Sequence, residues 1–110
     1  MYRVILYPEA RADLFKIEAY LKQSFGQRTA QQKIKLLLDQ LDSLSYFPRL
    51  GKRLPRFEAA ESENLFTLQT GKNTVLYHLD DAQSVISIYA IIDNRTELIR
   101  AQAIFFRERN

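Results

Sequence analysis

The chain has 110 residues, of which 46% are hydrophobic and 26% charged, proportions that suit one globular domain over residues 1–110 and exclude an intrinsically disordered chain. Cysteine is absent and His78 is the single histidine, which excludes disulfides and thiol catalysis and leads us to expect no metal or cofactor. The formal charge of +3, with a pI near 9.3, favours an acidic partner, either nucleic acid or an acidic protein segment.

The apolar segments are too short for a membrane protein. No apolar run approaches the roughly 20 residues that a membrane-spanning helix needs. The first apolar stretch ends at Pro8 and Glu9, unlike the apolar region of a cleavable signal peptide. We therefore expect a cytoplasmic protein that does not associate with a membrane.

The first half of the chain predicts one strand followed by two helices. Residues 2–7 are rich in strand-forming side chains and stop at Pro8, which suits the first turn of a helix. Two sets of apolar residues then recur at spacings of three and four, as on one face of a helix: Leu14, Ile17, Leu21 and Phe25, then Ile34, Leu37, Leu38, Leu41 and Leu44. Gly26 ends the first helix, Thr29 is the expected cap of the second, and Pro48 closes it. Helices joined so closely pack as an antiparallel hairpin.

The second half predicts a loop, three strands and a last helix. Residues 48–63 lack periodicity and form the expected surface loop. Strands are expected over residues 65–69, 74–79 and 85–92, and the last of these is so apolar that it is expected to be covered on both faces or to lie centrally in the sheet. A helix is expected to begin at Thr96. The order β-α-α-β-β-β-α predicts an α+β fold with a helical hairpin packed on a mostly antiparallel sheet.

Several short motifs occur in an order that is similar to one toxin family. They are Pro8-Glu9-Ala10 followed by Asp13-Leu14 and Ile17, then Phe47-Pro48-Arg49-Leu50-Gly51-Lys52, then Leu68, Gly71 and Val75-Leu76-Tyr77, and finally Arg95 with Glu97-Leu98. In this order they resemble the RelE/ParE superfamily, the toxins of type II toxin–antitoxin and plasmid-stabilisation systems. The resemblance covers about residues 1–98. It implies a toxin that inhibits growth and is neutralised by a cognate antitoxin, which lies as an extended or helical segment along the hairpin and sheet.

The resemblance allows two killing mechanisms. RelE-like members are ribosome-dependent mRNA endonucleases, in which a cluster of Arg and Lys stabilises the charge that develops on the phosphate. ParE-like members act on DNA gyrase and do not need that cluster. This chain has Phe66 and Thr74 where the family's arginines would stand, and Asn73 in place of its tyrosine. We therefore favour the ParE-like reading. A RelE-like nuclease and a non-toxic interaction module on the same scaffold remain the alternatives.

The candidate site residues are mostly basic. The catalytic candidates are Arg95, Lys52 and Arg53, and the candidate partner-binding residues are Arg49, Arg56, Lys72, Phe105 and Phe106. Each basic residue has a structural alternative, either as part of a solvated loop near glutamates or, for Arg95, as an ion pair with Asp93 or Glu97. The two phenylalanines cannot both face inward on one helix, so one of them is a candidate for an antitoxin or homo-oligomer contact. Of the neighbours Tyr77 and His78, we expect Tyr77 in the core and His78 on the surface.

Overall fold

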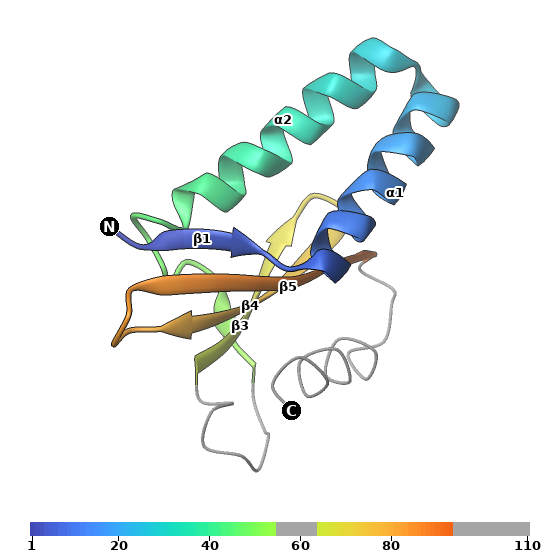
Figure 1. Ribbon diagram of the computed structural model, residues 1–110. Coiled ribbons are helices and arrows are strands. Elements are labelled where there is room, and N and C mark those ends of the chain that lie inside the picture. Colours follow the sequence, from blue (N-terminus) through green and yellow to red (C-terminus); the bar gives the residue numbers. More distant parts are fainter. Residues whose placement is uncertain (55–63, 94–110) are drawn as a thin grey trace.

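The structure, a computed structural model, describes residues 1–54 and 64–93, and its elements are arranged as two helices on one five-stranded sheet (Figure 1). In chain order the elements are β1 (Arg3–Leu6), α1 (Pro8–Phe25), α2 (Gln27–Ser43), β2 (Lys52–Arg53), β3 (Leu65–Thr70), β4 (Asn73–Asp80) and β5 (Val85–Asp93). The strand order is β1-β5-β4-β3-β2, with β1 parallel to β5 and every other pair antiparallel. The expected α+β fold is confirmed. The helix expected after Thr96 lies outside the described residues.

A single residue separates the two helices of the hairpin. Pro8 occupies the start of α1, where its missing N–H has no intrahelical partner to lose. Gly26, with a φ of 93°, both ends α1 and immediately precedes α2. Because glycine adopts this backbone conformation without strain, the chain reverses immediately and α2 starts at Gln27. The expectation that Thr29 caps the second helix is therefore wrong, since Thr29 lies inside α2 and no side chain caps that helix.

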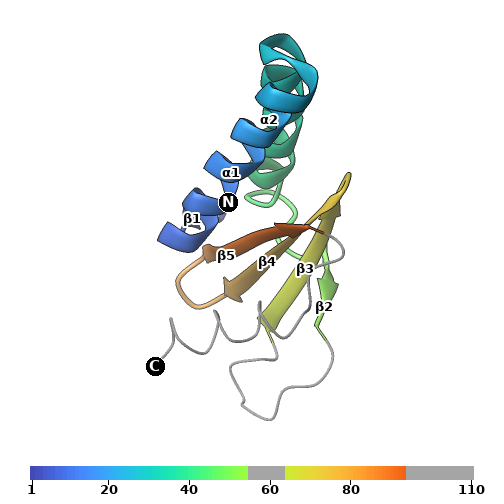
Figure 2. The ribbon, with the colours of Figure 1, turned by 90° about the vertical axis from the view of Figure 1, so that its right-hand side faces the viewer.

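The sheet has a buried apolar layer on each face. Figure 2 shows both helices on one side of the sheet, where Leu37 and Leu41 of α2 and Leu44 just after it form one buried cluster with residues such as Tyr77 and Ile88. The opposite face carries a second buried cluster: Leu54, Leu65, Leu76, Tyr89, Ala90 and Ile92. The prediction that the apolar 85–92 segment is covered on both faces or lies centrally is confirmed, because β5 lies between β1 and β4 and contributes to both clusters.

A bulge in β5 is matched by a polar contact from α1. The register with β4 shifts so that Leu76 faces Ala90 while Tyr77 faces Ile88, which leaves Tyr89 as the extra residue. Beyond the end of β1, the Asp13 carboxylate accepts a hydrogen bond of 3.0 Å from the Ile91 backbone N–H. Since β1 is too short to pair with this part of β5, the buried Asp13 side chain satisfies a main-chain donor that the sheet itself leaves open.

Candidate functional site

The candidate site is the segment that follows α2. This segment contains one of the motifs, its backbone is held by hydrogen bonds, and several of its side chains are exposed to solvent. It contains the Phe47-Pro48-Arg49-Leu50-Gly51 motif and leads into β2. Backbone hydrogen bonds fold it into consecutive turns, from Phe47 N–H to Ser43 O at 2.9 Å and from Leu50 N–H to Phe47 O at 3.1 Å. We call residues 44–51 the motif loop.

Tyr77 of β4 holds the motif loop from inside. Its hydroxyl donates to the Pro48 carbonyl oxygen at 2.8 Å and accepts from the Gly51 N–H at 3.0 Å. Burial raises the pKa of the Tyr77 phenol, so the hydroxyl stays neutral and keeps the proton that it donates. The loop lies so close to β3 that a Cβ on Gly51 would be 2.4 Å from the Thr67 carbonyl oxygen. Glycine is therefore required here by close approach of two backbones.

A surface network holds the same loop from outside. The Arg49 guanidinium donates to one oxygen of Asp81 at 2.6 Å, and the Tyr2 hydroxyl donates to the other at 2.6 Å. The hydrogen bonds from Tyr2 and Arg49 lower the pKa of the Asp81 carboxyl, and the bond to Asp81 raises the pKa of Tyr2. Three distant segments, namely the chain start, the motif loop and the β4–β5 turn, are thus joined at one point.

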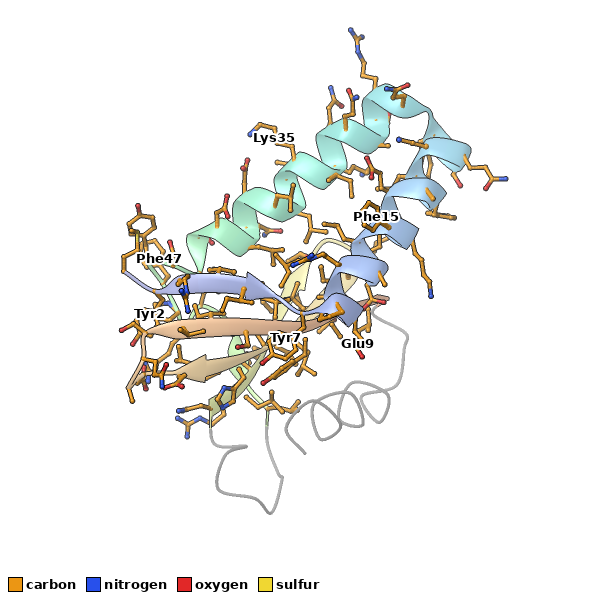
Figure 3. All side chains as sticks on the ribbon, in the orientation of Figure 1. Tyr2, Tyr7, Glu9, Phe15, Lys35 and Phe47 are labelled. Carbon is orange, nitrogen blue, oxygen red and sulfur yellow. The ribbon has the colours of Figure 1, made fainter. Side chains whose placement is uncertain are left out.

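Large apolar side chains remain exposed around this network. Tyr46 and Phe47 are 69% and 64% exposed, and Met1 and Leu50 are exposed as well. Figure 3 places Phe47 and Tyr2 at the same end of the molecule, beside the start of β1. The Tyr2 N–H donates to Ser45 O at 2.9 Å, which brings the first residues against the motif loop. An exposed apolar surface on an anchored backbone is typical of a protein contact site.

The candidate basic residues that lie in the described ranges are placed on different elements. Arg49 of the motif loop forms an ion pair with Asp81 of the β4–β5 turn. Lys52 and Arg53 are both exposed on β2, opposite Thr67 and Phe66, and consecutive strand residues point to opposite faces. Lys72 lies in the β3–β4 turn, at the other end of β4 from Asp81. Arg95, Arg56, Phe105 and Phe106 lie outside the described residues.

The positions at which the resemblance would place arginines are used for packing. Phe66 is 4% exposed, belongs to the cluster beneath the hairpin and stacks on Tyr77 with ring centroids 5.4 Å apart. Thr74 is likewise buried in β4. Tyr77, which sequence reasoning placed in the core, is buried as expected, but the role of its hydroxyl in holding the motif loop was missed. The contact of Asp81 with Tyr2 was missed as well, because it joins residues 79 positions apart.

His78 is not on the surface, and the expectation that it is exposed is wrong. It is 8% exposed, and its ring centroid lies 6.5 Å from that of Tyr89 on the face opposite the hairpin. Alternation along β4 does separate it from Tyr77, but both faces of the sheet are covered. Among residues 1–54 and 64–93 there is no group of three His, Cys, Asp or Glu side chains that could hold a metal ion. No helix in those ranges is both long and apolar enough to cross a membrane.

Several solved structures with a similar fold come from toxin–antitoxin systems. The chromosomal ParDE system of Pseudomonas aeruginosa aligns with a TM-score of 0.68 and 19% identity, over 84% of this chain and 96% of that one. A RelBE toxin–antitoxin complex from Mycobacterium tuberculosis gives 0.61 and 24%, over 84% and 96%. The archaeal RelE–RelB complex of Pyrococcus horikoshii gives 0.60 and 18%, over 87% and 98%. At these identities the likeness establishes the fold, which is that of the RelE/ParE-like toxins.

The family follows from the sequence. The model of the ParE toxin of the type II toxin–antitoxin system parDE matches residues 4–98. The chain therefore belongs to the ParE toxin family. No curated protein matches it significantly by sequence.

Proposed function

We propose that this toxin acts in the ParE manner, by inhibiting DNA gyrase, and that a cognate antitoxin neutralises it. The observation that carries the proposal is Phe66, which occupies a position expected for an arginine of the nuclease branch. Its ring is buried beneath the hairpin and stacked on Tyr77. An apolar side chain in that place supports packing and cannot stabilise a phosphate.

The distribution of the described cations supports the same branch. Cleavage of a phosphodiester places negative charge on non-bridging oxygens, and a nuclease stabilises that charge with fixed cations converging on one point. Arg49 already has its guanidinium on Asp81, while Lys52 and Arg53 point to opposite faces of the sheet edge. A gyrase inhibitor instead needs surfaces for a protein complex, and the exposed apolar residues of the motif loop supply one.

Expression in bacterial cells tests the proposal. The toxin is induced alone and together with the product of the adjacent small open reading frame, and a plasmid with a stop codon at Lys16 serves as control. We expect growth arrest with DNA breaks and an SOS response, relieved by co-expression, and inhibition of supercoiling by purified gyrase. Cleavage of mRNA within translated codons would instead assign the RelE-like activity. Normal growth at high expression would assign a non-toxic module on this scaffold.

A further inference from the structure

The far end of the helical hairpin projects beyond the sheet (Figure 1 and Figure 2). The hairpin residues that belong to the cluster on the sheet come from the first part of α1, the last part of α2 and the residue after it: Ala10, Leu14, Ile17, Leu37, Leu41 and Leu44. Residues 18–36, all within the described part of the chain, belong to neither core cluster. We call them the hairpin tip. Because the fold does not use the tip to cover the sheet, its exposed side chains are available for a contact with another molecule.

The hairpin tip concentrates positive charge. It contains four cationic side chains and one carboxylate, so a net charge of +3 lies within 19 residues and equals the formal net charge of all 110. The cations are all exposed: Lys22, Arg28, Lys33 and Lys35. Figure 3 shows Lys35 on the outer side of α2, directed away from α1. A concentration of exposed cations on a projecting element favours a polyanionic partner.

Two of these cations have no use within the fold. Arg28 and Lys33 form no ion pair with any residue in the ranges 1–54 and 64–93. Both lie in the first half of α2, and its acidic residues Asp39 and Asp42 lie towards the other end, whereas a helix dipole favours the reverse order. In α1 the order is the favourable one, with an acidic residue in the first turn and Lys22 in the last. The dipole of α2 therefore gives no reason for cations at its start.

Neutral hydrogen-bond donors and aromatic rings lie between the cations. The exposed amide and hydroxyl side chains of the tip are Gln23, Ser24, Gln27, Gln31 and Gln32. Glutamine and serine donate to the phosphate oxygens of DNA, as lysine and arginine do. Tyr20 and Phe25 are 62% and 56% exposed and contact each other edge to face, with ring centroids 6.3 Å apart. Cations interleaved with such donors and rings are typical of a nucleic-acid contact.

We propose that the hairpin tip binds the phosphate backbone of duplex DNA. The proposal rests on the proposed function, because a toxin that inhibits DNA gyrase acts beside the DNA that gyrase holds, and it names a second partner for that toxin. The contacts are to phosphates, so binding is independent of base sequence and weakens steeply with salt. The motif loop begins at the opposite end of α2, so the tip and the loop can be in contact with different molecules at once.

Fluorescence anisotropy tests the contact, with purified toxin, a labelled duplex of about 30 base pairs and salt varied between about 50 and 200 mM. The tip variant Arg28→Gln with Lys33→Gln removes the two unpaired cations. The matched control, Arg3→Gln with Arg11→Gln, removes two exposed cations near the sheet. Each neutralised phosphate contributes about 0.9 to the slope of log affinity against log salt, so the tip variant should lower that slope by about 1.8 and the control should leave it unchanged.

Urea unfolding separates a contact role of these cations from a structural one. The midpoint of the tip variant should not fall below that of the unmodified chain, because the dipole of α2 disfavours cations at its start. If the tip variant does not fold, the amide signals of residues 18–36 in the unmodified chain decide, since bound DNA should shift them and leave those of β4 in place.

Several results would overturn the proposal. Among them are equal slopes for the tip variant and the control, and the absence of duplex binding by the unmodified chain at about 50 mM salt. An RNA of the same length bound about tenfold more tightly would assign the tip to RNA, and polyglutamate bound as tightly as DNA would assign it to an acidic protein segment.

Inhibition of gyrase supercoiling by the same preparations distinguishes this proposal from the proposed function. Inhibition by a toxin whose tip does not bind DNA would refute the tip contact and leave the proposed function standing. Binding of DNA that depends on the tip, without inhibition, would refute gyrase as the target and leave the DNA contact standing.

Discussion

Replacing Tyr77 by phenylalanine tests whether one hydroxyl holds the motif loop. The change removes the hydrogen bonds to Pro48 O at 2.8 Å and from Gly51 N–H at 3.0 Å, while the ring can still stack on Phe66. A typical hydrogen bond contributes a net of about 0.5–1.5 kcal/mol, so the free energy of unfolding should fall by about 1–3 kcal/mol. Each kcal/mol shifts the melting temperature of a domain near this size by about 4–8 °C.

Urea unfolding followed by circular dichroism measures this loss. Tyr20→Phe is the matched control, because it removes the same atom from an exposed ring on α1 and should change stability by less than about 0.5 kcal/mol. Amide exchange at Gly51 gives a local readout and should accelerate in Tyr77→Phe only. If Tyr77→Phe is as stable as the control and Gly51 exchanges at its original rate, the hydroxyl does not hold the loop.

Three further changes test other parts of the described structure. Gly51→Ala places a Cβ 2.4 Å from the Thr67 carbonyl oxygen and should lower the free energy of unfolding by about 1–3 kcal/mol; unchanged urea unfolding would refute the close approach. Asp13→Ala leaves the Ile91 N–H buried without its acceptor and should cost about 1–3 kcal/mol, whereas Asp13→Asn keeps an acceptor and should cost less; equal losses would refute this reading. The lowered pKa of Asp81 means that its network stabilises the fold above the ordinary carboxyl pKa of about 3.9 and loses this effect as the pH falls through the folded value. An NMR titration that gives Asp81 an ordinary pKa would show that the network is absent in solution.

Periodicity predicted the elements because each one is half-buried. Leu37 and Leu41 of α2 and Leu44 at its C-terminal cap keep the spacing of one helical face, and all three are buried. The sequence of β5 is continuously apolar because side chains on both of its faces are buried. The spacing of apolar residues predicts burial less well near the tip of the helical hairpin. Phe25 continues the apolar spacing of α1 and is nevertheless 56% exposed, because periodicity reports which face a residue occupies and not whether anything lies opposite it.

Contacts between distant segments were beyond sequence reasoning. β2 has only two residues, both charged, so no periodicity could reveal it; its strand geometry comes from pairing with β3. His78 was placed on the surface because a polar residue next to a core tyrosine usually faces solvent, and that inference fails where a strand is covered on both sides. Likewise, Asp13 belongs to a helix motif, but its acceptor role depends on where β1 ends beside β5.

The motif loop shows why the family signature is more informative about structure than about killing. Gly51 is required by the nearness of Thr67, and the Pro48 carbonyl accepts the Tyr77 proton, so these motif residues serve the fold. Phe47 and Leu50 of the same motif have no such use and remain exposed on the backbone that the others fix. A loop anchored on both sides costs little further ordering when a partner binds, which makes its exposed side chains efficient contacts. The side chains that distinguish one partner from another are therefore expected at exposed Phe47 and Leu50, rather than at the motif residues that hold the loop in place.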